Sequence, residues 1–238
     1  MRVKIVFSYD GSKFNGLERQ KSGRTIQKEI ENALKTIYKE DIFIKAAGRT
    51  DAGVHANGQT AHFEAPCIMK NLKSNLNNLL LPDIFIIDLK KANDNFHARH
   101  DAKKKEYIYK INLGPFKSCL NDYMLQPRYK IDIQNMKEAS KVFIGTHDFH
   151  NFVSGERNSY VTTIESIKFR KVFDTLEIHF IGVAFYRYMV RNMVGALLEV
   201  GKCTVFPDTL KEMLEFPNTK KTLPTAPSVG LYLNKVWY

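Results

Sequence analysis

The sequence predicts an α+β fold made of two successive β-α-β-β-α-β halves, each built on a mainly antiparallel, mixed sheet. Two observations predict this class. Short apolar runs of strand length alternate with longer segments whose apolar residues recur at helical spacing. The same order of strands and helices then occurs twice within 238 residues, a length that suits two compact halves. This order is the split β-α-β, ferredoxin-like arrangement.

The first half contains four expected strands and two expected helices. The strands are expected over residues 2–9, 42–47, 59–64 and 84–87. The first helix is expected over 26–38, because its apolar residues share one face and Thr25 can serve as the N-cap. Leucines at helical spacing predict a second helix that ends before Pro82.

The second half repeats the order. Its strands are expected from Tyr107 to Leu113, over 161–171, over 175–181 and from Val229 to Leu233. Helices are expected from Met136 to Phe143 and over 185–200, where Gly201 ends the apolar face. Pro207 is expected to open another short helix.

A charged stretch from Lys90 to Lys105 is the expected junction, which gives domains of residues 1–103 and 104–238. Both halves are expected to be RRM-like, because sheets of this arrangement also occur in RNA-binding modules. A basic cleft flanked by the two sheets would be the natural place for a ligand.

The composition points to a polyanionic partner. Lys and Arg number 36 against 25 Asp and Glu, so the net charge is +11. Such a chain can bind nucleic acid by neutralising phosphates and releasing counterions. A solvated basic surface without a specific ligand would give the same composition.

Several classes of function are not expected. The three cysteines form no Cys-x-x-Cys pair, which fits a reducing cytoplasm. Neither export nor membrane insertion is expected, because Arg2 to Phe7 lack a long apolar signal region and no apolar run approaches the ~20 residues that span a bilayer. No phosphate-cradling glycine motif is present, so no nucleotide cofactor is expected. His97 with His100, and His147 with His150, would suit a metal-dependent nuclease or deaminase, but they lack further ligands at zinc spacing.

A loop is expected from Gly48 to Gly58, and its segment from Gly48 to His55 gathers the residue types that carry chemistry. Asp51 offers a carboxylate close in sequence to the cation of Arg49, and the flanking glycines let the backbone bend and a ligand approach. The pattern predicts that Asp51 is a reactive carboxylate. A turn in which Asp51 caps a neighbouring amide would use the same residues.

Two further groups of cations could serve this site. Arg187 and Arg191 lie one turn apart on the expected helix, where an arginine facing the cleft would lower the pKa of a buried Asp; phosphate binding is the other interpretation. A second group precedes two tyrosines, Tyr107 and Tyr109, one of which could stack on an unpaired base, although Tyr109 is better suited to the core. The expected RNA-binding cations of this second group are Arg99, Lys103, Lys104 and Lys105.

These residues resemble the tRNA pseudouridine synthase A family, whose hallmark is the segment from Gly48 to His55. The resemblance covers nearly the whole chain. It extends to Tyr9-Asp10-Gly11, Thr25-Ile26-Gln27, Gln59 to Phe63, Phe96 to Arg99, Lys105-Glu106-Tyr107, Gly145 to Phe149, Met189 to Gly195 and Gly230 to Leu233. One departure is Leu17-Glu18, where the family often has Trp and Gln, so early-loop RNA contacts are expected to differ.

The resemblance implies the pseudouridine synthase fold and a role for each site residue. Asp51 is similar to the family's catalytic aspartate, and Arg191 to its partner. Tyr107 is similar to the tyrosine that stacks on the target uracil and is a candidate base. Arg49 is similar to the arginine that helps to hold the flipped-out nucleotide, and Leu231 to an apolar wall of the pocket.

The implied activity is isomerisation of uridine to pseudouridine in the anticodon stem-loop of tRNA, at positions 38–40. The resemblance also implies a homodimer that holds one tRNA across both subunits and needs no cofactor or metal. The alternative is a non-catalytic RNA-binding protein of two RRM-like modules. That alternative explains the charge and the tyrosines, but an unneeded carboxylate in the glycine-flanked loop would repel phosphate.

Overall fold

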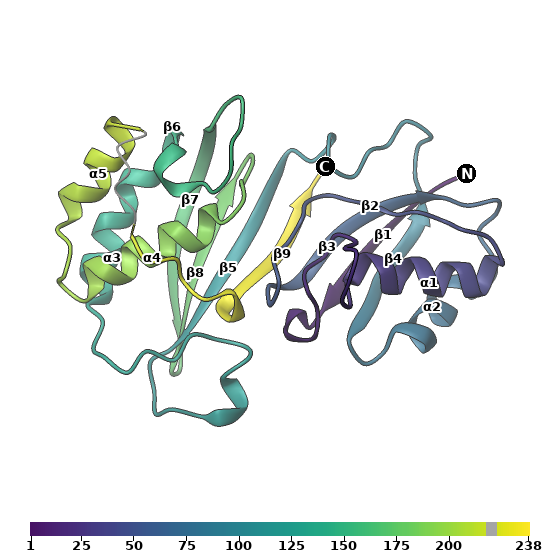
Figure 1. Ribbon diagram of the computed structural model, residues 1–238, viewed down its shortest axis with the longest axis horizontal. Helices are drawn as coiled ribbons and strands as arrows, with labels where there is room; N and C mark the ends of the chain where they lie inside the picture. The colour runs from purple at the N-terminus through teal and green to yellow at the C-terminus, as the bar shows by residue number, and fades with distance from the viewer. Residues whose placement is uncertain (218–222) are drawn as a thin grey trace. The chain divides into compact units, whose positions relative to one another are not determined.

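The computed structural model describes residues 1–217 and 223–238 and forms two compact units (Figure 1). The first unit comprises Met1–Lys103 and Tyr232–Tyr238, and the second comprises Lys104–Leu231. The division expected from the sequence placed residues 232–238 with the second half. In the structure they lie with the first unit, because the last strand pairs in parallel with the strand that carries His55 and Ala56.

The first unit has a sheet in the order β4-β1-β3-β9, with β2 added on β3. Its strands are β1 (Arg2–Tyr9), β2 (Lys45–Ala46), β3 (His55–Glu64), β4 (Ile84–Lys91) and β9 (Leu231–Trp237). Its helices are α1 (Ile26–Tyr38) and α2 (Leu72–Leu80), which lie together beside the sheet (Figure 1). β1 is antiparallel to both β3 and β4, so most of this sheet is antiparallel.

Alternation along β1 forms the core of this unit. Val3, Ile5 and Phe7 are fully buried, whereas the residues between them are half-buried, as expected for a strand with one face against helices. Helix α1 begins where the sequence predicted, because the Thr25 hydroxyl accepts a hydrogen bond from the Lys28 N–H at 3.4 Å.

The second unit has an antiparallel sheet in the order β5-β8-β7-β6. Its strands are β5 (Lys104–Asn112), β6 (Gly145–Asp148), β7 (Val161–Val172) and β8 (Thr175–Gly182). Its helices are α3 (Ile133–Ser140), α4 (Met189–Gly201) and α5 (Pro207–Glu215). Short 3₁₀ helices in the two units lie at Gly11–Lys13, Ser118–Leu120, Lys141–Phe143, His150–Phe152 and Ser228–Gly230.

The α+β class is confirmed, and the differences from the expected elements have local causes. β6 was not predicted, because its four residues carry no apolar alternation. α4 starts at Met189 and not at 185, because Tyr188 takes a left-handed conformation with φ of 61° and so ends the preceding turn. β3 starts at His55, inside the expected loop, where it pairs with β9. Among the described residues, no helix is long and apolar enough to cross a bilayer.

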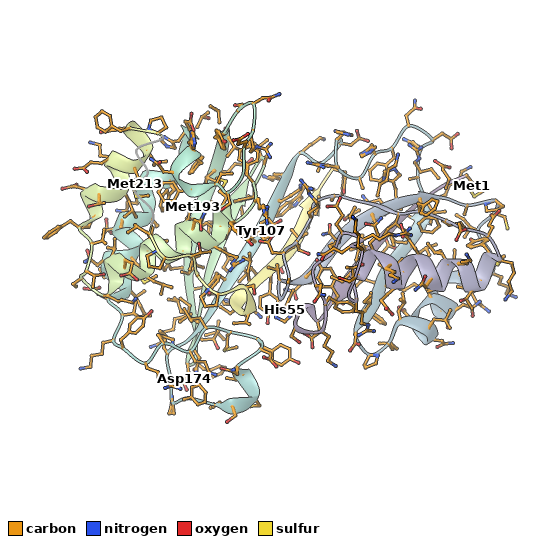
Figure 2. The ribbon with its side chains drawn as sticks, in the orientation of Figure 1. Met1, His55, Tyr107, Asp174, Met193 and Met213 are labelled. Carbon is orange, nitrogen blue, oxygen red and sulfur yellow. The ribbon has the colours of Figure 1, made fainter. Side chains whose placement is uncertain are left out.

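The turn between β7 and β8 contains a phenylalanine in a backbone conformation that phenylalanine does not favour. Phe173 has φ of 51° and is 93% exposed, next to Asp174 (Figure 2). A side chain in the left-handed region costs roughly 1–2 kcal/mol, and glycine avoids that cost. We expect Phe173→Gly to be more stable than Phe173→Ala by about 1 kcal/mol in urea-induced unfolding. Equal stability of these two variants would contradict the strain at this turn.

Candidate active site

The loop that carries Asp51 is held by its neighbours through main-chain contacts. The Leu17 N–H donates to the Thr50 carbonyl at 3.1 Å, and the Val54 N–H donates to the Asp51 carbonyl at 3.2 Å. The Thr50 hydroxyl shares a 2.8 Å hydrogen bond with the Tyr9 hydroxyl. Thr50 is buried and Asp51 is half-buried, so the loop fixes the backbone from which the carboxylate projects.

Two glycines of the preceding segment allow this close approach. A Cβ at Gly16, where φ is +96°, would lie 2.9 Å from the Thr50 carbonyl oxygen. A Cβ at Gly11 would lie 2.0 Å from the Val54 carbonyl oxygen, far inside contact distance. Because both obstacles are backbone atoms of the Asp51 loop, no larger residue fits at either position without moving that loop.

The end of the loop is fixed by a buried histidine. His55 is 2% exposed, and its Nδ1 accepts a hydrogen bond from the Gly11 N–H at 3.1 Å. Its ring stacks on Tyr232, with 4.6 Å between the ring centroids. His55 is labelled in Figure 2. It is therefore a structural residue of the loop, a role that no residue pattern in the sequence indicated.

Tyr9 supports the loop as a neutral phenol. Burial raises the pKa of Tyr9 to about 12, and its hydrogen bonds to Thr50 and Gln59 offset only part of that effect. The hydroxyl therefore keeps its proton at neutral pH and remains a hydrogen-bonding group. Gln59 holds the start of the loop as well, because its Nε2 donates to the Gly48 carbonyl at 2.9 Å.

Arg49 extends from the loop toward solvent and pairs with the residue at which the sequence departs from the family pattern. Its Nη1 lies 3.2 Å from the Glu18 carboxylate, and the two side chains are 64% and 58% exposed. An ion pair this exposed is worth only about 0–1 kcal/mol. Glu18 therefore costs little free energy to displace when an anion approaches Arg49.

In the second unit, Tyr107 lies on β5 with only 8% of its surface exposed. The Phe185 ring packs edge-on against its ring, with 5.1 Å between centroids (Tyr107 is labelled in Figure 2). Leu231 is also buried, at 6% exposure. Tyr109, for which the core was expected, is fully buried, and its hydroxyl donates to the Pro227 carbonyl at 2.8 Å.

Arg187 and Arg191 meet at one aromatic ring, although only Arg191 is on the helix. Their guanidinium carbons lie 5.1 Å and 4.7 Å from the centroid of the Tyr188 ring. The Nε of Arg191 also donates to the Ala226 carbonyl at 2.8 Å. Arg187 is exposed and lies in the turn before α4, whereas Arg191 is half-buried. The structure thus brings these two predicted residues together.

The other expected RNA-binding cations flank the point in the chain, between Lys103 and Lys104, where the first unit ends and the second begins. Arg99 and Lys103 belong to the first unit and are exposed. Lys104 and Lys105 open β5 in the second unit and are half-buried, and the Lys104 ammonium lies 2.9 Å from the Glu165 carboxylate. Arg99 and Lys103 are therefore the members of this group that solvent reaches most easily.

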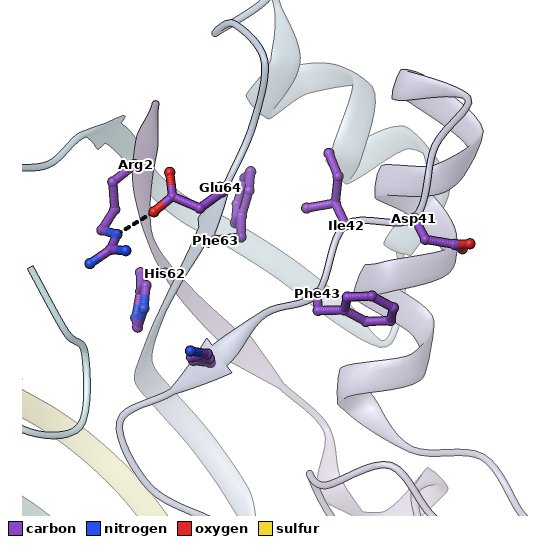
Figure 3. A pocket seen from close by; sticks show the side chains of 8 residues that line it. Arg2, Asp41, Ile42, Phe43, His62, Phe63 and Glu64 are labelled. Atoms are coloured by element: carbon purple, nitrogen blue, oxygen red, sulfur yellow. Dashed lines mark hydrogen bonds and ion pairs between the residues drawn. The ribbon is translucent and has the colours of Figure 1, made fainter. Parts of the chain in front are cut away.

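A separate pocket of about 250 Å³ lies on the first unit and includes none of the predicted site residues (Figure 3). Arg2, Lys45, Asp41 and Glu64 balance its charges, and the Arg2 Nε lies 2.5 Å from the Glu64 carboxylate. His62 in this pocket has its pKa lowered to about 4, mainly by burial. The pocket therefore has no net charge at neutral pH with which to attract phosphate. In the described part of the chain, no three His, Cys, Asp or Glu side chains cluster as metal ligands would.

Comparison with known proteins places this chain in a family. A family model described as tRNA pseudouridine synthase matches residues 139–238. The tRNA pseudouridine synthase A of Bacillus pumilus is 40% identical over 245 residues, which cover 100% of this chain and 99% of that protein. The protein of the same name from Thermodesulfovibrio yellowstonii is 38% identical over the whole of both chains. The chain belongs to the tRNA pseudouridine synthase A family.

As a tRNA pseudouridine synthase A family member, the protein is an isomerase of the pseudouridine synthase class, as the sequence predicted. The resemblance to this family over nearly the whole chain is thereby confirmed. The tRNA pseudouridine synthase A of Bacillus subtilis is 39% identical over 245 residues. A solved archaeal box H/ACA sRNP Nop10-Cbf5 complex matches 82% of this chain and 44% of its own, at 11% identity and a TM-score of 0.37.

Proposed function

We propose that this protein converts uridine to pseudouridine in the anticodon stem-loop of tRNA, at positions 38–40, with Asp51 as the catalytic carboxylate. The observation that carries the proposal is the fixed loop around Asp51, which presents a half-buried carboxylate on a chain with a net charge of +11. A negative charge without a function on a nucleic-acid-binding surface would repel phosphate, which supports a chemical role for this carboxylate.

The reaction fits the chemistry of these residues. The bond between N1 of uracil and C1′ of the ribose breaks, the base turns, and a bond forms between C5 and C1′. The C5 proton leaves and N1 gains a proton, so nothing is oxidised or lost overall. A carboxylate can stabilise or trap the sugar or the base fragment, and a base must remove the C5 proton. The roles we propose are Asp51 as nucleophile and Tyr107 as the group that stacks on the uracil.

The arginines supply positive charge in this proposal. Arg191 keeps the reacting carboxylate ionised, because a nearby guanidinium lowers the pKa of an Asp that burial would raise. Arg49 and Arg187 bind the displaced nucleotide and its phosphates, and Leu231 forms an apolar wall for the base. Extracting the base from the helix costs a few kcal/mol, which phosphate contacts and stacking offset.

Arg99 and the three lysines that follow it complete the proposed tRNA surface. The exposure of Arg99 and Lys103 supports phosphate binding at these two positions. We also propose that the protein acts in the cytoplasm and forms a homodimer, as the family resemblance implies. Sedimentation of the purified protein would test the homodimer.

Tritium release from uridine labelled at C5 tests the function directly. We expect the purified protein to release tritium from a tRNA transcript that has uridine at positions 38–40. Release should stop when these uridines alone are replaced by cytidine. Release that persists after the replacement would contradict the anticodon-arm site, and a protein that binds tRNA without any release would favour the non-catalytic alternative.

A further inference from the structure

The start of α4 has an unusual backbone conformation. Tyr188 is its N-cap residue, with φ of 61° and ψ of −2°, and its side chain makes no capping hydrogen bond. N-cap residues normally adopt an extended backbone and accept a hydrogen bond from the first turn. A bulky side chain in the left-handed region is strained, whereas Asn or Gly adopts this region readily. Tyr188 is therefore a poor residue for its local structure.

The surrounding contacts hold Tyr188 in this conformation. The Met189 N–H donates to the Tyr186 carbonyl at 3.1 Å, and the Asn192 N–H donates to the Tyr188 carbonyl at 2.8 Å. Just before it, the Ser154 N–H donates to the Arg187 carbonyl at 3.0 Å. Strained residues persist where the surrounding structure fixes them in this way, and they cluster at functional sites.

The strained backbone of Tyr188 places its ring against two arginine side chains. The guanidinium carbon of Arg191 lies 4.7 Å from the ring centroid, and that of Arg187 lies 5.1 Å from it. Both distances are within the range of a cation–π interaction. The backbone conformation at residue 188 sets the direction of its Cα–Cβ bond, so the left-handed conformation and the position of the ring are linked.

Arg191 is thereby held by two different groups. The Ala226 carbonyl accepts from its Nε at 2.8 Å, and the Tyr188 ring faces its guanidinium carbon. The Ala226 N–H also donates to the Arg191 carbonyl at 3.1 Å, which ties the segment at 226 to the helix. A planar guanidinium with these two constraints loses little rotational freedom when it acts on a ligand.

We propose that Tyr188 is a positioning residue, whose ring holds the guanidinium groups of Arg191 and Arg187 where the isomerisation requires them. This inference depends on the proposed function, in which Arg191 keeps the reacting carboxylate ionised. Tyr188 itself does not touch the substrate. The alternative is that Tyr188 has a purely structural role. In that case, a substitution that relieves the backbone strain without loss of stability should leave kcat unchanged.

Substitution by Asn separates these two roles. Tyr188→Asn removes the ring and relieves the backbone strain, so we expect equal or higher thermal stability together with about a tenfold lower kcat for tritium release and a smaller change in KM. Tyr188→Phe keeps the ring and should restore most of the turnover. Tyr188→Asn with the kcat of the unaltered protein would overturn the proposal. Should Tyr188→Asn fail to fold, the strain argument fails, and Tyr188→Leu, which has no π face, tests the ring.

A double-mutant cycle with Arg191 shows whether Tyr188 acts through that arginine. Arg191→Lys keeps the charge and loses the planar guanidinium. If Tyr188 acts through Arg191, adding Tyr188→Asn to Arg191→Lys should lower the single-turnover rate by less than twofold further. Independent, multiplying losses would overturn the inference. Full turnover by Arg191→Lys and by Arg191→Gln would instead contradict the proposed role of Arg191. The experiment therefore distinguishes failure of the Tyr188 inference from failure of the proposed function.

Discussion

Asp51→Asn is expected to lower the rate of pseudouridine formation by at least about 10³-fold, while tRNA affinity stays within a few fold. The amide has nearly the same shape as the carboxylate but cannot act as a nucleophile at the sugar or the base. The hydrogen bonds that hold the loop at Thr50 and Val54 use main-chain atoms and the Thr50 hydroxyl, so the loop should keep its conformation. Tritium release measures the rate, and filter binding measures the affinity.

A matched control removes the same charge elsewhere in the first unit. Asp41 is exposed and pairs with Lys35 at 2.8 Å, and Asp41→Asn changes the net charge by the same amount. We expect this control to keep its turnover. If Asp51→Asn retains full activity, Asp51 is not the catalytic carboxylate; if both variants lose activity equally, the loss reflects charge and not chemistry.

The sequence was sufficient for the elements that local patterns determine. The alternation of Val3, Ile5 and Phe7 predicted a strand with one buried face, and Thr25 predicted the start of α1. The pairing partner of a strand could not be predicted in this way, because it depends on tertiary contacts. β9 was expected in the second half, yet it pairs in parallel with β3, and no residue pattern within β9 carries that information.

The candidate site was predictable to a similar extent. Residue types singled out Asp51 and Arg49, because a carboxylate and a cation between glycines are unusual in a basic chain. The support behind them was not predictable, since it consists of distances: the Thr50 carbonyl near Gly16 and the Tyr9 hydroxyl on Thr50. The left-handed backbone of Tyr188 was hidden too, because the apolar spacing of the helix continues across it.

Gly11→Ala is expected to lower kcat by about a hundredfold or more, although residue 11 carries no side chain that could take part in the reaction. The added Cβ would lie 2.0 Å from the carbonyl oxygen and 2.4 Å from the carbonyl carbon of Val54, and 2.9 Å from the His55 nitrogen. All three are main-chain atoms, so the clash cannot be relieved by rotating a side chain. The Asp51 loop has to move, and a shift of about 1 Å at a reacting group can cost a factor of about 10².

Gly23→Ala is the matched control for this substitution. Gly23 has φ of +88°, and the three atoms nearest to its added Cβ all belong to the side chain of Asn15, which can turn away. This control should lose about 1 kcal/mol of stability, the usual penalty for alanine in the left-handed region, and should keep its kcat. Gly11→Ala should lose both stability and kcat, because its neighbour is the loop itself. A Gly11→Ala protein with unaltered kcat would mean that the position of the loop does not govern the reaction. That result would contradict the assignment of Asp51 as the catalytic group.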